Sequence, residues 1–248
     1  MENVAWSVHG RLATIALQRP DRHNAITSDM LRAITAACIE IEASAEVDVV
    51  VLEGRGPNFS VGFDLDEIET GNTADGAVAG SEAITALLDL GAVTVARLHG
   101  WVVGGGAALA AACDLRVGDP TVTIRIPEVP LGIPLGWGAM PLLVAEMGPS
   151  ATKDLVMTGR DMGADEAYRR GLLTRLAGEA ELDTEVDRLV AELLAVPVGP
   201  LRLTKQQANT AAAVIRTGDE DAARLIEAVT SDDFGEVFQR YLQRVRRR

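Results

Sequence analysis

Two glycine-containing turns in this sequence could bind an oxygen atom that becomes negatively charged during a reaction. One is Gly62-Phe63, and the other is Gly104-Gly105-Gly106, which follows an apolar stretch and precedes an alanine-rich segment of high helix propensity. Glycine lets a ligand atom approach the backbone closely, and the first amides of a helix have no intrahelical acceptors and lie at the positive end of its dipole. Two such amides converging on one oxygen would stabilise an enolate, each by about 2.7–4 kcal/mol. Taken alone, the triple glycine is equally typical of a purely structural feature, namely a tight turn between a strand and a helix that packs against a neighbouring segment.

Glu128 is the candidate acid or base. It follows Pro127 in a proline-rich stretch that reaches Pro134 and is expected to form a rigid loop. One positioned carboxylate can contribute about 10²–10⁴ in rate by proton transfer. The alternative is a surface or helix-capping carboxylate. Asp64 and Asp66 could also reach such a site, but N-cap and first-turn roles suit them better.

The elements that must position these residues alternate between strand and helix in the first half of the chain. The apolar patterns predict strands at 6–9, 13–18, 47–52, 94–98, 114–117, 122–126 and 173–176, and helices at 28–41, 81–90, 137–147, 149–158, 164–170 and from 181 onward. The stretch 71–80 is predicted to be a mobile loop. This order predicts an α/β fold of repeated strand–helix units with right-handed crossovers. The helical last third cannot bury itself alone, so it must pack on the core or on another subunit.

Composition excludes several classes of protein. The 248 residues are 48% hydrophobic and carry a net charge of −13, which argues against nucleic-acid binding in spite of the basic ending at 244–248. That ending is interpreted as a solvated tail. Cys38 and Cys113 lie in apolar runs and are predicted to be buried free thiols, as in a cytoplasmic protein. No metal-ligand spacing, signal pattern or membrane-length apolar run is evident.

Three segments together resemble the enoyl-CoA hydratase/isomerase, or crotonase, superfamily. They are 59–65 (Phe-Ser-Val-Gly-Phe-Asp-Leu), 99–115 with its triple glycine, and 127–134 (Pro-Glu-Val-Pro-Leu-Gly-Ile-Pro), within a similarity that covers nearly the whole chain. The resemblance implies a spiral of ββα units over 1–195 that holds an acyl-CoA site. It implies a helical trimerisation region over 196–248, and hence a trimer or a dimer of trimers. Coenzyme A would be part of the substrate, with no separate cofactor.

The resemblance also assigns site residues. The oxyanion-hole donors would be the backbone amides of Phe63 and Gly105, with Glu128 as the catalytic carboxylate. The remaining substrate and CoA contacts would come from Arg22, Ala25, Asp64, Leu65, Asp66, Trp137 and Lys205. Arg22 and Lys205 are candidates for the CoA phosphates, although each could equally be an ordinary surface charge.

The sequence departs from the hydratase pattern at Ala108, where hydratases of this family carry the first of two water-holding glutamates. The second glutamate is present as Glu128, and isomerases of the family function with one glutamate at this position. Two bulky residues also differ from many relatives: Phe63 stands where alanine is common, and Trp137 stands in a glycine-rich stretch. Trp137 either lines and narrows the acyl pocket or packs in the core.

These features favour isomerisation of an enoyl-CoA by Glu128. A hydratase with an atypical one-glutamate site and a CoA-ester binding protein with little activity are the alternatives. A decarboxylase or a thioester hydrolase would be a further possibility, because one fold supports many chemistries.

Overall fold

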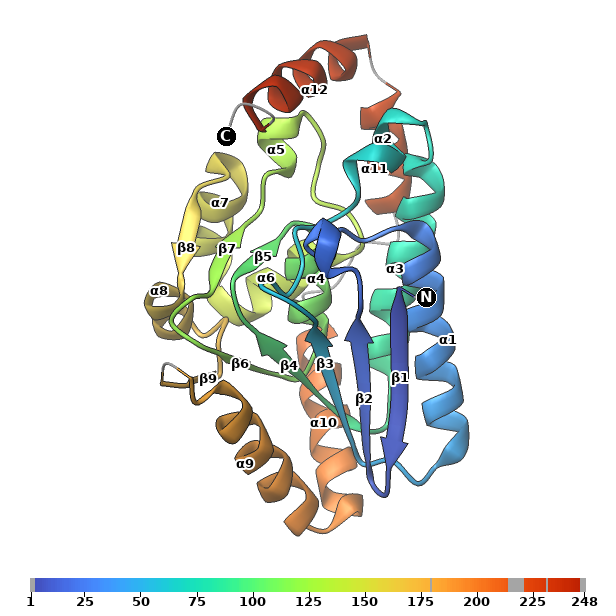
Figure 1. Cartoon of the computed structure of the whole chain (residues 1–248), viewed down its shortest axis with the longest axis vertical. Coiled ribbons are helices and arrows are strands. Elements are labelled where there is room, and N and C mark those ends of the chain that lie inside the picture. The colour runs from blue at the N-terminus through green and yellow to red at the C-terminus, as the bar shows by residue number, and fades with distance from the viewer. Residues whose placement is uncertain (1–2, 179, 214–220, 231, 246–248) are drawn as a thin grey trace.

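Six strands form the main sheet of the computed structural model, which describes residues 3–178, 180–213, 221–230 and 232–245 (Figure 1). Their order is β1-β2-β3-β4-β6-β9, and only the β1–β2 pair is antiparallel. A second sheet has the order β5-β7-β8. The strands are β1 (Val4–His9), β2 (Leu12–Leu17), β3 (Val49–Gly54), β4 (Val93–Leu98), β5 (Trp101–Val103), β6 (Leu115–Gly118), β7 (Thr123–Arg125), β8 (Asp161–Gly163) and β9 (Arg175–Leu176).

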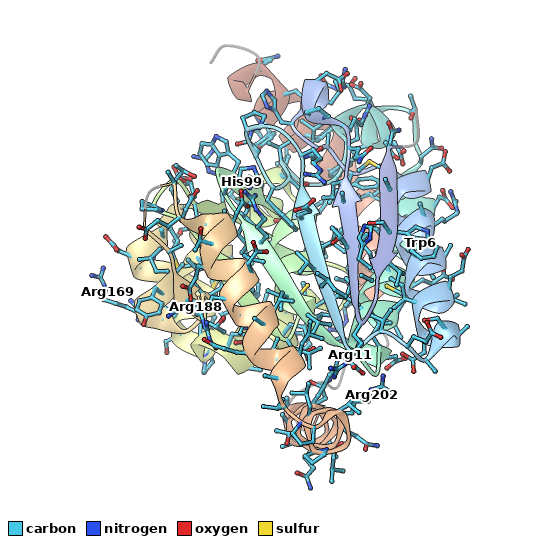
Figure 2. All side chains as sticks on the ribbon, turned by 60° about the horizontal axis from the view of Figure 1, so that its bottom comes forward. Trp6, Arg11, His99, Arg169, Arg188 and Arg202 are labelled. Carbon is cyan, nitrogen blue, oxygen red and sulfur yellow. The ribbon has the colours of Figure 1, made fainter. Side chains whose placement is uncertain are left out.

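The central strands are covered on both faces, as their continuous apolar runs predict. Val49 and Val51 of β3 pack with Val95 of β4 against α9 (Leu182–Ala195), whereas the alternate residues Val50 and Leu52 face the main core. Figure 2 shows α9 crossing one face of the sheet. In Figure 1, α1 and α3 lie beside β1, the first strand in the order of the sheet.

The helices begin and end where local chemistry directs. The side chain of Thr27 accepts from the Met30 amide and caps α1. The α4 helix, made of glycine, alanine and leucine, is buried along its whole length. The helices are η1 (Pro20–Arg22), α1 (Ser28–Ser44), α2 (Leu65–Glu69), α3 (Thr73–Asp89), α4 (Gly105–Ala112), α5 (Glu128–Leu131), α6 (Ala139–Met147), α7 (Pro149–Thr158), α8 (Ala164–Arg170), α10 (Val198–Ala213), α11 (Asp221–Val229) and α12 (Asp232–Val245), in addition to α9. None of those in the described ranges has the length and apolar character needed to cross a bilayer.

The predicted loop at 71–80 is wrong, because α3 begins at Thr73 and continues through it. Its glycines serve close packing and not a turn. A Cβ at Gly76 would overlap the ring of Phe63, and one at Gly80 would overlap the indole of Trp137. The expected rigid loop after Pro127 is also partly helical, since it contains α5. The short strands β5 and β8 were not expected from the sequence.

The C-terminal helices return to the core after α10 leaves it. Arg202 at the start of α10 donates to Val47 O and to Asp48, which also pairs with Arg11, and Figure 2 shows both arginines where α10 leaves the sheet. Figure 1 shows α11 beside α3 and α12 over α5. The division of the chain at 195/196 stays a prediction, and residues 246–248 of the expected basic tail lie outside the described residues.

Both cysteines are buried and unbonded, as the sequence predicts. Burial raises the pKa of Cys38 and of Cys113 to about 12, so neither thiol is ionised near neutral pH.

Arg116 is the largest fully buried side chain among the described residues, and its guanidinium has polar partners. Its guanidinium pairs with Glu146 at 2.6 Å and donates to the carbonyls of Leu172 and Cys113 at 2.5 and 2.6 Å. It therefore joins β6 to α6 and to the chain segment that precedes β9.

We expect Arg116→Met to lower the free energy of unfolding by about 3–5 kcal/mol, because it leaves Glu146 and two carbonyl groups without their partner. Urea unfolding followed by circular dichroism measures the change. The matched control is Arg188→Ala, which removes an exposed arginine paired with Glu185 and should change stability little. Equal effects of the two variants would contradict a structural role for Arg116.

Candidate active site

A cavity of about 540 Å³ brings the predicted site residues other than Lys205 together. Its lining residues come from the segments 21–25, 61–68, 73–77, 101–105 and 125–137. The last two helices add Leu225, Tyr241 and Leu242. One end carries the charged residues Asp21, Arg22 and Asp66. The other end is apolar and includes Leu131 and Ile133 with the C-terminal leucines.

Backbone pairing with β5 places the two glycine turns side by side. The Ser60 amide donates to Trp101 O at 3.1 Å, and the Val103 amide donates to Ser60 O at 2.9 Å. The segment leading to Gly62 therefore runs along β5 toward the start of α4. A Cβ on Gly62 (φ +91°) would lie 2.9 Å from Val103 O and 3.7 Å from the Gly105 nitrogen, so glycine is needed here.

The amides of Phe63 and Gly105 both adjoin the cavity and are available as donors. Ile26 donates to Gly62 O and accepts from the Asp64 amide, a pairing that skips the amide of Phe63. Gly105 is the first residue of α4, where an amide has no intrahelical acceptor. Among the described residues no backbone bond engages either amide. The structure thus brings the two predicted donors to one wall, and their binding of a single oxygen stays a prediction.

Each glycine of the triple run contacts a different group. A Cβ on Gly104 (φ +50°) would lie 2.5 Å from Oε1 of Glu128, and one on Gly106 would lie 2.9 Å from Cβ of Ser60. A Cβ on Gly105 would overlap the indole of Trp137. The catalytic candidate, the indole and the upstream turn therefore all pack directly on this backbone.

One carboxyl oxygen of Glu128 has no hydrogen-bond partner among the described residues. The residue begins α5, its Oε2 is buried, and no described residue hydrogen-bonds to that oxygen. Burial raises the pKa of Glu128 to about 7 because it disfavours the charged form, and only the residue's own backbone amide acts against it. A carboxyl group with a pKa near neutrality can both accept and donate a proton.

Ala108 lies one turn farther along α4 and does not line the cavity. It is 1% exposed and packs in the main hydrophobic core. The position that holds a glutamate in the hydratase pattern is therefore a packing position in this chain.

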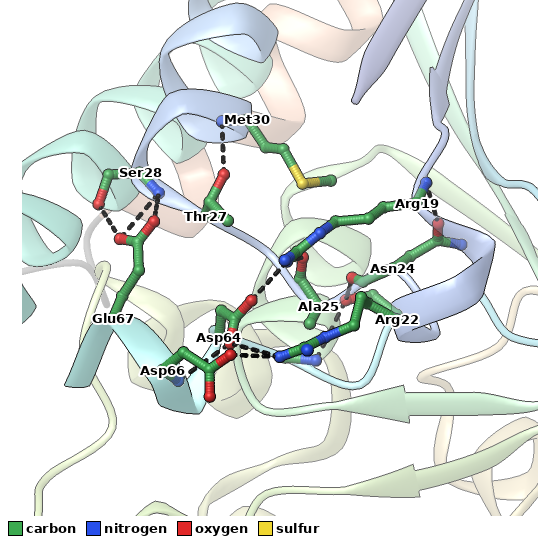
Figure 3. Close-up of polar contacts among 12 residues, drawn as sticks. Arg19, Arg22, Asn24, Ala25, Thr27, Ser28, Met30, Asp64, Asp66 and Glu67 are labelled. Atoms are coloured by element: carbon green, nitrogen blue, oxygen red, sulfur yellow. Dashed lines mark hydrogen bonds and ion pairs between the residues drawn. The ribbon is translucent and has the colours of Figure 1, made fainter. Parts of the chain in front are cut away.

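Arginine–carboxylate pairs fix the charged end of the cavity (Figure 3). Asp64 caps α2 by accepting from the Asp66 amide at 3.0 Å and pairs with Arg19, and Arg22 bonds Asp66 at 2.5 Å. Burial raises the pKa of Asp64, but the bond from Arg19, the backbone bond and the two arginine charges outweigh it, so the net pKa is below the ordinary value. The capping and first-turn roles expected from the sequence are confirmed for Asp64 and Asp66. Ala25 and Leu65 also line the cavity, and Leu65 packs on the apolar cluster that includes Leu131 and Ile133.

The structure separates Lys205 from the other predicted residues. Its ammonium lies 2.8 Å from Asp114 and donates to Ala92 O at 2.8 Å, and its side chain is 7% exposed. It does not line the cavity. Lys205 therefore joins α10 to the sheet here, and the expectation that it contacts a CoA phosphate finds no support.

Sequence reasoning missed the residues that α11 and α12 contribute. Leu225 and Leu242 belong to an apolar cluster with Leu131 and Ile133, and Tyr241 lines the cavity beside them. The apolar residues of α12 recur at helical spacing and show that it has a buried face. They do not show on which surface that face packs.

Comparison with known proteins agrees with this geometry. The family model for enoyl-CoA hydratase/isomerase matches residues 8–246. The chain is 31% identical to the short-chain-enoyl-CoA hydratase of Clostridium acetobutylicum over 96% of its own length and 90% of that protein. An enoyl-CoA hydratase from Mycobacterium avium subsp. paratuberculosis has the same fold, with a TM-score of 0.90, 23% identity, and coverage of 96% and 98% of the two chains. A Thermobifida fusca protein solved with acetoacetyl-CoA superposes with a TM-score of 0.79 and 29% identity over 94% and 95% of the chains. The crotonase fold expected from the sequence is confirmed.

We expect Glu128→Gln to stabilise the protein at alkaline pH. The pKa of Glu128 is about 7 in the folded chain against an ordinary 4.5, so its contribution to stability is fully present below 4.5 and is lost as pH rises through 7. The glutamine variant avoids this loss, and its free energy of unfolding should exceed that of the wild type by about 3 kcal/mol at pH 8.5. Urea unfolding at pH 8.5 and pH 5 measures the difference, which should shrink toward pH 5. A difference independent of pH would contradict the raised pKa.

Proposed function

The chain belongs to the enoyl-CoA hydratase/isomerase family, and we propose that it shifts the double bond of an enoyl-CoA with Glu128 as its single proton carrier. The observation that carries the proposal is the carboxyl group of Glu128: its buried Oε2 has no hydrogen-bond partner among the described residues, and its Oε1 adjoins Gly104, the N-cap of α4. A buried polar atom without a partner is costly, and a reacting substrate would supply what it lacks.

The proposed reaction moves one proton between two carbons of the acyl chain. The carboxylate of Glu128 takes the proton from Cα of a 3-enoyl thioester, and the electron pair passes into a dienolate. The amides of Phe63 and Gly105 stabilise the negative thioester oxygen. The protonated Glu128 then returns the proton to Cγ, which gives the 2-enoyl thioester and restores the carboxylate. A pKa near 7 suits a group that must perform both steps.

Water addition is harder to derive from these residues, because it calls for a second group to hold the water. Ala108 is in the core, and the cavity carboxylates Asp64 and Asp66 are held by arginines. Proton transfer within the substrate requires neither a second carboxylate nor a bound water.

The charged end of the cavity is the proposed CoA site. Arg22 is nearly half exposed there, and its guanidinium could meet a phosphate while keeping its bond to Asp66. The apolar end suits the acyl group, and the acetoacetyl-CoA bound by the Thermobifida fusca protein supports a thioester ligand. Association as a trimer or a dimer of trimers is part of the proposal.

We expect Glu128→Gln to lower the rate of 3-hexenoyl-CoA isomerisation by about 10²–10⁴-fold, since it removes the proton carrier. Binding of hexanoyl-CoA, measured by calorimetry, should persist. For the wild type, kcat/KM should rise with pH through about 7, because the first step needs the carboxylate. Glu53→Gln is the matched control, since Glu53 is mostly buried, pairs with Arg55 and lies outside the cavity. Turnover that survives in Glu128→Ala would overturn the assignment.

Hydration is the second candidate, favoured by the hydratase relative and by Tyr241. The phenol lines the cavity, and its pKa is raised by burial and further by Glu128, against the opposing charge of Arg125. It therefore stays protonated at neutral pH and could donate a hydrogen bond to a water.

If this chain is a hydratase, Tyr241→Phe should lower hydration of crotonyl-CoA by at least about tenfold while leaving isomerisation of 3-hexenoyl-CoA near the wild-type rate. Both reactions can be followed by absorbance and product chromatography. A wild type that does not hydrate crotonyl-CoA excludes this candidate, and binding without turnover of either thioester contradicts both.

A further inference from the structure

We infer that Trp137 limits the length of the acyl chain, so that the substrate class is a short-chain acyl thioester. The inference rests on the proposed function, in which the cavity binds an acyl-CoA. The indole of Trp137 lies between α3 and α4 and lines the cavity. It packs on Gly105, whose backbone amide is one of the proposed oxyanion-hole donors.

Two glycines make room for the indole. A Cβ on Gly80 of α3 would overlap its five-membered ring, and a Cβ on Gly105 of α4 would overlap its six-membered ring. The residue is 7% exposed. The indole therefore fills the space between the two helices at the level of the proposed thioester oxygen.

Phe63 extends this wall. Its ring packs on Gly76, one turn before Gly80 on α3, and meets the indole edge to face with the ring centroids 5.9 Å apart. Edge-to-face contact is a favoured arrangement of two aromatic rings. Adjacent turns of α3 thus hold two aromatic rings that support each other.

The backbone at Trp137 is specialised for directing the ring inward. The residue has φ +60°, an uncommon conformation for a bulky side chain, and is flanked by Gly136 and Gly138. Gly136 itself contacts Leu225 of α11. Uncommon backbone conformations of this kind concentrate at ligand-contacting sites, which favours a role beyond core packing.

The position of the wall determines its effect on substrates. CoA is proposed to lie at the end marked by Asp21, Arg22 and Asp66, so an acyl chain bound at Gly105 extends away from that end past the wall formed by α3 and the indole. A chain that lengthens in the direction of α3 meets the indole directly after the thioester. Mismatch of a single methylene in an apolar pocket changes selectivity by roughly 10-fold or more.

Calorimetry with butyryl-, hexanoyl-, octanoyl- and decanoyl-CoA tests the inference without depending on turnover. For the wild type we expect affinity to fall by at least about 10-fold between butyryl- and octanoyl-CoA. In Trp137→Ala this fall should disappear or reverse, while the affinity for butyryl-CoA does not increase. Gly80→Ala should act in the opposite sense, because its methyl group pushes the indole into the cavity and weakens binding even of butyryl-CoA.

Trp101→Ala is the matched control, because Trp101 also lines the cavity but packs on Arg125, 5.0 Å from its ring centroid. It should change the affinity for every chain length by the same factor. If Trp137→Ala behaves in that way, the inference is overturned. If Trp137→Ala does not fold, Trp137→Phe, which keeps a smaller ring, decides by an intermediate chain-length profile. A wild type that binds no acyl-CoA refutes the proposed function and the inference with it, whereas binding without chain-length dependence refutes the inference alone.

Discussion

The arrangement of the site depends on close approach to the backbone at the start of α4. Gly104, Gly105 and Gly106 contact a carboxylate, an indole and a serine respectively, and a methyl group on any of them would displace its neighbour. The neighbours come from α5, from the segment before α6 and from the strand-like turn that pairs with β5. Three distant parts of the chain therefore take their positions from one helix terminus. The same terminus carries amides without intrahelical acceptors, so the feature that organises the packing also supplies the electrostatics.

This organisation has a cost in stability. Burying the Glu128 carboxyl beside the helix terminus without a partner raises its pKa to about 7, which means that its charged form is disfavoured in the folded chain. The surrounding structure offsets that cost. The aliphatic core packs around a fully buried α4, and the buried charge of Arg116 has carbonyl and carboxylate partners. Among the described residues, two buried side-chain atoms have no hydrogen-bond partner, Oε2 of Glu128 and Nε of Arg202. Of these two residues Glu128 lines the cavity, and it is the candidate for chemistry.

The sequence predicted most of what depends on local pattern. Apolar patterns located β3, β4 and α1, and the two glycine turns with Glu128 located the centre of the cavity. It failed where tertiary contact decides. Gly76 and Gly80 indicated a loop, but they lie inside a helix because two aromatic rings pack on them. Lys205 was expected at the ligand, yet Asp114 binds its ammonium. Where α11 and α12 pack could not be inferred, since an apolar helix face does not identify its partner surface.

The chemistry of the site then depends on which side chains this common framework presents. An oxyanion hole alone permits several reactions of a thioester, and the fold by itself does not select among them. In the proposed function, selection comes from two residues, one on α4 and one in the segment before α6. Ala108 leaves α4 without a second carboxylate, and Trp137 fills the adjacent space with an apolar ring. In the proposed mechanism, a site without a second carboxylate to hold a water favours returning the abstracted proton to the substrate over adding a hydroxyl group. The alanine on α4 and the indole that packs on Gly105 are therefore both consistent with the proposed transfer of a proton within the substrate.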